Sequence, residues 1–176
     1  MRSGMRRPCR LAFTMIELVA VIAILGIVAV FVGGPTLSYV DSIRARTAAS
    51  RLSGDIRYLQ RMALSSGLRT WVVFSTASNN YRLYVEDRAN PGKANRLPAA
   101  QPLDQSASAV QFGSGPFTNV WITAVSINGT SELEFDTFGV PYDANGTALS
   151  VDGTVSLSTG ASVMVHPVGG LVERAG

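Results

Sequence analysis

The chain of 176 residues contains very little cysteine, histidine or lysine. Cys9 is the only cysteine, and it precedes a long apolar run, so no disulfide, cysteine-based metal site or thiol nucleophile can form beyond it. His166 is the only histidine, and its place in an alternating segment before Pro167 predicts a surface position. Because no suitable base accompanies the serines, we expect neither an enzyme nor a cofactor.

Charged residues are also scarce, at 15% of the chain, and the net charge of the whole chain differs from that of the part beyond the apolar run. The formal net charge of +3 includes four arginines that precede the apolar run: Arg2, Arg6, Arg7 and Arg10. Without them, eleven basic side chains face twelve acidic ones, which sum to −1. One later segment concentrates basic residues: Arg82, Arg88, Lys93 and Arg96. Two acids within that segment, Glu86 and Asp87, offset part of its positive charge. Near the C-terminus the charge of Glu173 offsets that of Arg174. We therefore do not expect a nucleic-acid partner.

A long apolar run is the most prominent feature that is present. Every residue from Leu18 to Gly34 is apolar or glycine. With the five residues before it, the run forms a helix of roughly 33 Å at about 1.5 Å per residue, enough to cross a hydrocarbon core of about 30 Å. A buried helix of a soluble domain would need partners on all sides, and little downstream sequence supplies them.

Two ordinary kinds of segment share this pattern. A secretory signal peptide explains the basic leader and the apolar run, but Phe31 or Val32 stands where its cleavage site needs a small residue, and Pro35 follows. The second kind of segment is a plain single-pass membrane anchor. The arginines on its two sides predict its orientation in the membrane only weakly. Neither explains an acid, Glu17, directly before the run.

Residues 12–18 read AFTMIEL, and this segment resembles the processing site of type IV prepilins and of type II secretion pseudopilins. The short basic leader, Gly26 within the run and the closing Pro35 also fit. The resemblance implies that a prepilin peptidase removes a leader, residues 1–12, by cutting between Ala12 and Phe13, and that the new amino group of Phe13 is methylated. Ala12 stands where the family usually has glycine. Residues 13–35 then form a transmembrane and assembly helix.

The resemblance also gives Glu17 a role in assembly. A carboxylate in the bilayer costs about 2.5–3.5 kcal/mol on insertion scales. The cationic amino terminus of a neighbouring subunit, brought close in a low dielectric, would offset that cost. The alternative is that Glu17 only caps its own helix, which stabilises a helix by about 0.3–1 kcal/mol.

Beyond the run, the sequence predicts that the helix resumes after a kink or short break at Gly33-Gly34-Pro35 and continues as an amphipathic half, residues 36–67. Arg51 and Asp55 are expected one turn apart on its outer face, and Gly67 is expected to cap its end. The predicted apolar stripe consists of Ile43, Leu52, Ile56, Leu59 and Ala63.

From residue 68 to 176 the pattern alternates with period two, which predicts a β-sheet domain. Segments 69–75 and 81–87 are expected to pair around a turn at 78–80, and Asn128-Gly129 and Thr159-Gly160 are expected to close two further hairpins. Residues 88–109 form a long polar loop, which predicts a mobile or contacting element. Trp71, Trp121 and the tyrosines are assigned to the core. The predicted class is α+β, with a long helix packed on one antiparallel sheet of six or seven strands.

The order of these segments is similar to that of the H-type minor pseudopilins and related minor pilins, although Val140 stands where their late segment often has arginine. The resemblance implies a minor pseudopilin of type II secretion; the alternatives are a minor type IV pilin in pilus assembly, adhesion or DNA uptake, and an anchored binding module that never polymerises. It implies other pilins or pseudopilins, prepilin peptidase and the bacterial inner membrane as partners, with a cytoplasmic N-terminus and a periplasmic C-terminal domain.

A metal site is not expected. Four residues suggest a calcium loop, Asp136, Asp143, Asn145 and Asp152, but the spacing departs from that of an EF-hand and no glutamate closes the loop. Asn145-Gly146 is instead predicted to be a turn. Calcium stays an alternative, because the major pseudopilins resemble this fold and bind it.

Overall fold

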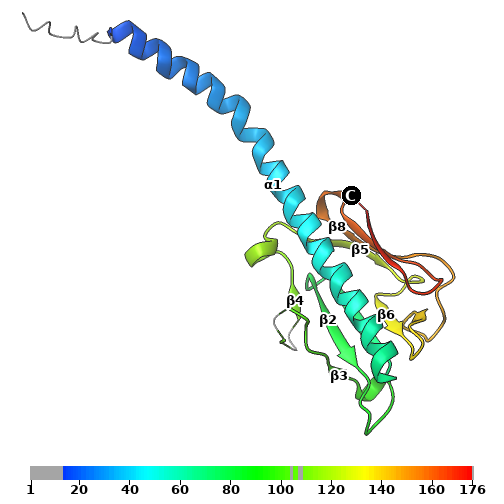
Figure 1. Cartoon of the computed structure of the whole chain (residues 1–176). Helices are drawn as coiled ribbons and strands as arrows, with labels where there is room; N and C mark the ends of the chain where they lie inside the picture. The colour runs from blue at the N-terminus through cyan, green and yellow to red at the C-terminus, as the bar shows by residue number, and fades with distance from the viewer. Residues whose placement is uncertain (1–13, 104, 107–108, 176) are drawn as a thin grey trace, which may run out of the picture. The chain divides into compact units, whose positions relative to one another are not determined.

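The structure, a computed structural model, describes residues 14–103, 105–106 and 109–175, and in residues 30–38 it describes the backbone only. The chain divides into two units, Met1–Tyr39 and Val40–Gly176. One long helix is followed by ten short strands in the described residues, with antiparallel pairing throughout (Figure 1). The predicted α+β class is confirmed.

Helix α1 runs from Met15 to Ser66, a length of 52 residues. It continues through Gly33-Gly34-Pro35, so the predicted break is absent. A proline removes one N–H donor from a helix and crowds the carbonyl four residues earlier, and the neighbouring hydrogen bonds continue the helix past it. At the other end Gly67 has φ of 65° and its N–H donates to the Ala63 carbonyl at 3.0 Å, which confirms the predicted cap.

The predicted apolar stripe on α1 is correct in its second half. Leu52, Ile56, Leu59 and Ala63 are fully buried. Ile43 is 46% exposed, because it lies nine residues before Leu52 and therefore about half a turn out of phase at roughly 100° per residue. Three small side chains extend the buried face instead: Ala45, Ala48 and Ala49.

The first sheet has the order β3-β2-β1-β6-β7, and β4 also pairs with β2. Its strands are β1 (Thr70–Ser75), β2 (Asn80–Val85), β3 (Leu97–Pro98), β4 (Val110–Gln111), β6 (Glu132–Phe135) and β7 (Pro141–Tyr142). β1 and β2 form the predicted hairpin, with Asn79 at φ of 50° in the turn. Single turns of 3-10 helix lie at η1 (Lys93–Asn95) and η2 (Gly115–Phe117).

The second sheet has the order β10-β9-β8-β5. Its strands are β5 (Ile122–Ser126), β8 (Gly153–Leu157), β9 (Ser162–Val165) and β10 (Val172–Ala175). β8 and β9 pair as predicted around Thr159-Gly160, which lies in η3 (Ser158–Gly160). β10 ends the sheet as an edge strand.

The single predicted sheet is therefore wrong, and the Asn128-Gly129 turn explains why. Asn128 and Gly129 have positive φ, and Ile127 and Thr130 exchange two backbone hydrogen bonds, so the predicted tight turn forms. The strands then separate: β5 pairs with β8, and β6 pairs with β1. A turn fixes only the residues next to it, whereas the partners of each strand depend on which arrangement buries more apolar surface.

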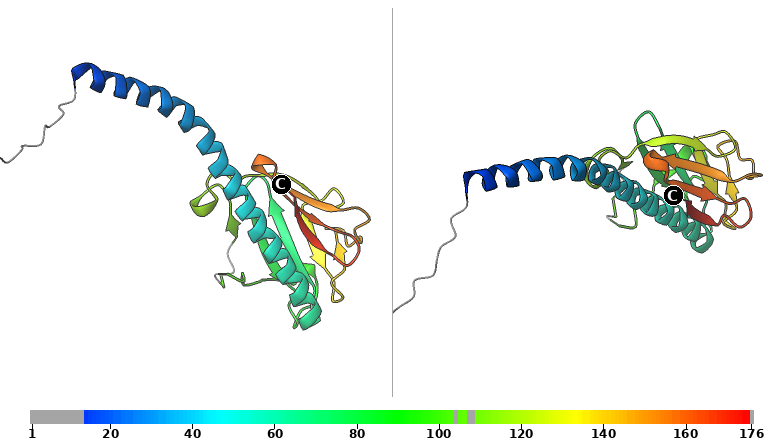
Figure 2. Two further views of the ribbon diagram at one scale, coloured as in Figure 1. Left: turned by 45° about the horizontal axis from the view of Figure 1, so that its top comes forward. Right: turned by 90° about the horizontal axis from the view of Figure 1, so that it is seen from above.

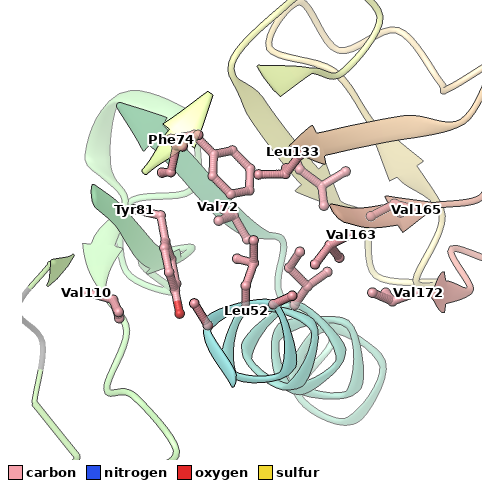
Figure 3. Close-up of a cluster of buried hydrophobic side chains, with 14 of the residues drawn as sticks. Leu52, Val72, Phe74, Tyr81, Val110, Leu133, Val163, Val165 and Val172 are labelled. Atoms are coloured by element: carbon pink, nitrogen blue, oxygen red, sulfur yellow. The ribbon is translucent and has the colours of Figure 1, made fainter. Parts of the chain in front are cut away.

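The core of the second unit lies between α1 and both sheets. Figure 3 shows Leu52 of α1 facing Val72 and Leu133 of the first sheet on one side and Val163 of the second sheet on the other. Both sheets lie along the Val40–Ser66 part of α1 in the two further views as well (Figure 2). The helix thus covers the inner faces of two sheets at once.

Two of the aromatic residues assigned to the core are exposed, and one of them is Tyr39, at 68%. Trp71 is fully buried, but Trp121 is 54% exposed, because it directly precedes the edge strand β5. The expected long loop after β2 is partly regular, since it contains η1 and β3 and adds β3 to the first sheet.

Candidate assembly site and other charged sites

The first turn of α1 is capped by Thr14. Its Oγ1 accepts a hydrogen bond from the backbone N–H of Glu17 at 3.3 Å, and its carbonyl accepts from the same N–H and from that of Leu18. Threonine at this position is a common N-cap, and the glutamate three residues later suits the positive end of the helix dipole. Ala12 and Phe13, the predicted cleavage and methylation residues, lie outside the described residues.

The Glu17 side chain is exposed. The capping bond to Thr14 uses the backbone N–H of Glu17 rather than its carboxylate. In the described part of the chain, the carboxylate is thus available to an outside partner. Its predicted role in assembly remains a prediction.

Helix α1 exposes apolar side chains all around its first four turns. Ten large apolar residues between Met15 and Val28 are 42–85% exposed. Exposed apolar surface on this scale marks a contact with another protein or with lipid. Among the described residues, no helix combines the length and the hydropathy that a membrane span requires. The predicted transmembrane segment, residues 13–35, lies partly outside the described side chains.

His166, the only histidine, takes part in a surface cluster of charges. Its Nδ1 lies 2.8 Å from Asp152 Oδ1, and its Nε2 lies 3.4 Å from Glu173 Oε2. These two carboxylates, Asp152 first, raise the pKa of His166. The histidine thus links the segment before β8 to β10 and is partly exposed, which fits the predicted surface position.

Two of the aspartates considered for calcium, Asp136 and Asp143, stabilise turns. Asp136 Oδ1 accepts from the N–H groups of Phe138 and Val140, and Asp143 Oδ1 accepts from those of Asn145 and Thr147. The backbone hydrogen bonds, that from Thr147 first, lower the pKa of Asp143. Gly146 has φ of 75°, as the predicted turn requires. In the described residues there is no group of three or more side chains arranged to hold a metal ion.

Half of the basic cluster of residues 82–96 is ion-paired within the chain. Lys93 Nζ and Arg96 Nη1 lie 2.8 Å and 2.7 Å from the same oxygen of Glu132, and Arg88 donates to the carbonyl of Ser66. Arg96 also lies over the ring of Tyr84, with 4.5 Å to the centroid. The contacts of Lys93 and Arg96 hold the segment after β2 against the first sheet, and Arg88 contacts the end of α1.

Sequence reasoning missed the internal position of Asp55. The sequence predicted an outer-face pair with Arg51, and the pair exists, with 3.2 Å from Nε to Oδ2. However, Asp55 is only 2% exposed, because it lies on the same side of the helix as Leu52 and Ile56. Its carboxylate also accepts a hydrogen bond from Tyr81 of β2. The sequence does contain a sign of this buried site, because Asp55 is a charged residue within the apolar stripe of the helix, and a buried charge needs a partner.

In a comparison with protein families, residues 7–33 match the prokaryotic N-terminal methylation motif. The chain carries a prepilin-type N-terminus. This match supports a type IV pilin-like protein that is a substrate of prepilin peptidase and assembles with other pilin subunits. Neither the comparison with curated proteins nor the comparison with solved structures found a match.

Proposed function

We propose that this protein is a minor pseudopilin of a type II protein secretion system. In this proposal prepilin peptidase cuts between Ala12 and Phe13, Phe13 is methylated, and the mature chain joins a pseudopilus. The protein is a structural subunit without enzymatic activity of its own. The observation that carries the proposal is that the methylation motif at residues 7–33 overlaps the start of a 52-residue helix, and that the second part of this helix belongs to an α+β unit.

The proposed location is the bacterial inner membrane, with residues 13–35 spanning it once. The leader lies in the cytoplasm and the β-sheet domain in the periplasm. Exposed apolar side chains around the first turns of α1 support this arrangement, because water is a poor environment for them and lipid or a neighbouring helix is a good one.

A minor type IV pilin is the second candidate, since pilins and pseudopilins share the same N-terminal motif. Val140 stands where the late segment of the H-type pseudopilins and of the related minor pilins often has arginine, so this residue does not separate the two candidates. The two candidates differ in the machine they serve, not in how the N-terminus works.

Mass spectrometry of the protein purified from membranes tests the shared part of the proposal. We expect the mature chain to begin at N-methylated Phe13. Ala12→Gly should leave cleavage intact and Ala12→Lys should block it. A mature chain that begins after Pro35 would instead identify a secretory signal peptide.

Deletion of the gene separates the two machines. Loss of exported protein from the medium with intact pili supports the pseudopilin, and loss of pili with normal secretion supports the minor pilin. Neighbouring genes for a secretion ATPase and a secretin, or for pilus retraction, give the same distinction.

A further inference from the structure

Arginines that are far apart in the sequence line one groove between α1 and β10, which we call the arginine groove. It consists of two adjoining hollows of about 440 Å³ and 480 Å³. Arg46, Arg57 and Arg174 line the first, and Arg57 and Arg61 line the second. Figure 3 shows Val172, the first residue of β10, beside the helix.

The arginine groove holds an excess of positive charge. Glu173 is the one acid among its lining residues, and its carboxylate lies against His166 Nε2. Arg57 and Arg61 donate to backbone carbonyls, of Val172 and Arg57 respectively. Within the described part of the chain, Arg46 and Arg174 form no ion pair.

Several other basic residues of the same unit are neutralised within the chain. Arg44, Arg69, Arg96 and Lys93 each pair with an aspartate or glutamate of this chain. Six arginines of this unit pair with no carboxylate of the described residues: the four of the groove, Arg82 and Arg88. The four stand out because they line one groove together, whereas Arg82 and Arg88 do not line it. A guanidinium presents a planar set of donors that matches a carboxylate, often through two parallel hydrogen bonds.

The groove also has features that suit an extended chain. β10 is an edge strand, and such a strand has backbone groups on one side that do not pair within the sheet. At one end of the groove, Val168 and Leu171 are 88% and 55% exposed. An occupant with acidic side chains along the arginines and an apolar side chain on Val168 and Leu171 complements the whole surface.

We propose that the arginine groove binds an extended acidic segment of a neighbouring pilin-like subunit. The inference rests on the proposed function, because it places the partner in the same filament. Nucleic acid fits less well, since four arginines neutralise fewer than the roughly 6–10 phosphates that tight DNA binding uses. The side chains of the mature chain also sum to −1 and repel a polyanion.

Site-specific photo-cross-linking of the full-length protein in its native bacterium tests this. A photoreactive amino acid replaces Ala175, which is exposed on β10 and lines the groove. Ala124 is the matched control, because it is an exposed alanine on β5, the opposite edge of the same sheet. We expect the Ala175 position alone to cross-link to a subunit with a prepilin-type N-terminus, at a peptide that contains at least two acidic residues.

Charge reversal gives the second measurement. Arg174→Glu in the Ala175 background should reduce the cross-link about tenfold, the effect of losing one charge-assisted pair. Arg82→Glu makes the same change in net charge on an exposed residue of β2 and should leave the yield unchanged. Any of four results would overturn the proposal. These are equal yields from Ala175 and Ala124, a cross-linked peptide without acidic residues, a cross-link to nucleic acid or lipid alone, and a yield that Arg174→Glu does not change.

A photoreactive residue at Ile22 distinguishes failure of the groove from failure of the proposed function. Ile22 is exposed on the part of α1 that belongs to the first unit, so a cross-link from it reports assembly through that part of the helix. Cross-links from Ile22 to pilin-like subunits without one from Ala175 overturn the arginine groove and leave the proposed function standing. The absence of both overturns the two together.

Discussion

The hydroxyl of Tyr81 donates a hydrogen bond of 2.6 Å to Oδ2 of Asp55, and both side chains are almost completely buried. Arg51 Nε donates to the same oxygen, so a carboxylate from α1 is held in the core by a cation and a phenol. Burial, and then the charge of Asp55, raise the pKa of Tyr81 well above its ordinary value. The hydroxyl therefore stays protonated and remains a donor.

Tyr81→Phe should lower the free energy of unfolding by about 1.5–3 kcal/mol, because a buried carboxylate loses a donor and hydrogen bonds to charged groups have about that value. Chemical denaturation of the full-length protein in detergent micelles measures it. Tyr142→Phe is the control, since Tyr142 is only partly buried, and should change stability by less than about 0.5 kcal/mol. Equal effects of the two variants would contradict a special role for the Asp55 contact.

Gly170 and Gly169 offer a matched pair of substitutions. Both have φ near 65°, so alanine at either position carries the strain of the left-handed conformation, about 1–2 kcal/mol. A Cβ on Gly170 would lie 2.6 Å from Gln60 Nε2 and 2.9 Å from the Gly139 carbonyl, whereas one on Gly169 meets nothing within 4 Å. We expect Gly170→Ala to destabilise the protein by about 1–3 kcal/mol more than Gly169→Ala. Similar melting temperatures for the two would contradict this packing.

The His166 cluster should make stability depend on pH. Its folded-state pKa lies above the ordinary value of 6.5, so its stabilising contribution is full below pH 6.5 and is lost as the pH rises through the raised pKa. The difference in melting temperature between the natural protein and His166→Gln should therefore be larger near pH 6 than near pH 8.5. Asp152→Asn should remove most of that pH dependence, and a difference that grows with pH would contradict the assignment.

Glu17 can be tested without disturbing the helix cap. The capping bond from residue 17 to Thr14 uses the backbone N–H, so Glu17→Ala leaves it in place. We expect the variant to be inserted and cleaved normally but to fail to co-purify with partner subunits. Glu17→Asp should be partly defective, because its shorter side chain leaves the two charges farther apart in a low dielectric.

The capping alternative gives a different order of effects. If Glu17 acts only on its own helix, Glu17→Asp and Glu17→Ser should be nearly silent, because both residues suit a helix N-terminus. Cross-linking to partner subunits in complemented cells measures incorporation. Normal incorporation of Glu17→Ala would exclude the assembly role.

The sequence by itself determined the features that depend on neighbouring residues. The methylation motif, the helix end at Gly67 and the turns at Asn79, Asn128-Gly129 and Asn145-Gly146 were all predicted correctly. Each follows from local chemistry, because a cap or a left-handed turn residue acts within a few positions of itself.

Only the tertiary structure decided which distant segments meet. It separated β5 from β6 into two sheets, brought Asp55 to Tyr81 across 26 residues, and brought Arg57 to Val172 across 115. These contacts depend on how one helix covers two sheets, since burial of apolar surface is not directional and favours any pairing that removes it from water. The arginine groove likewise follows from that packing, because nothing local relates Arg46 and Arg57 of α1 to Arg174 of β10.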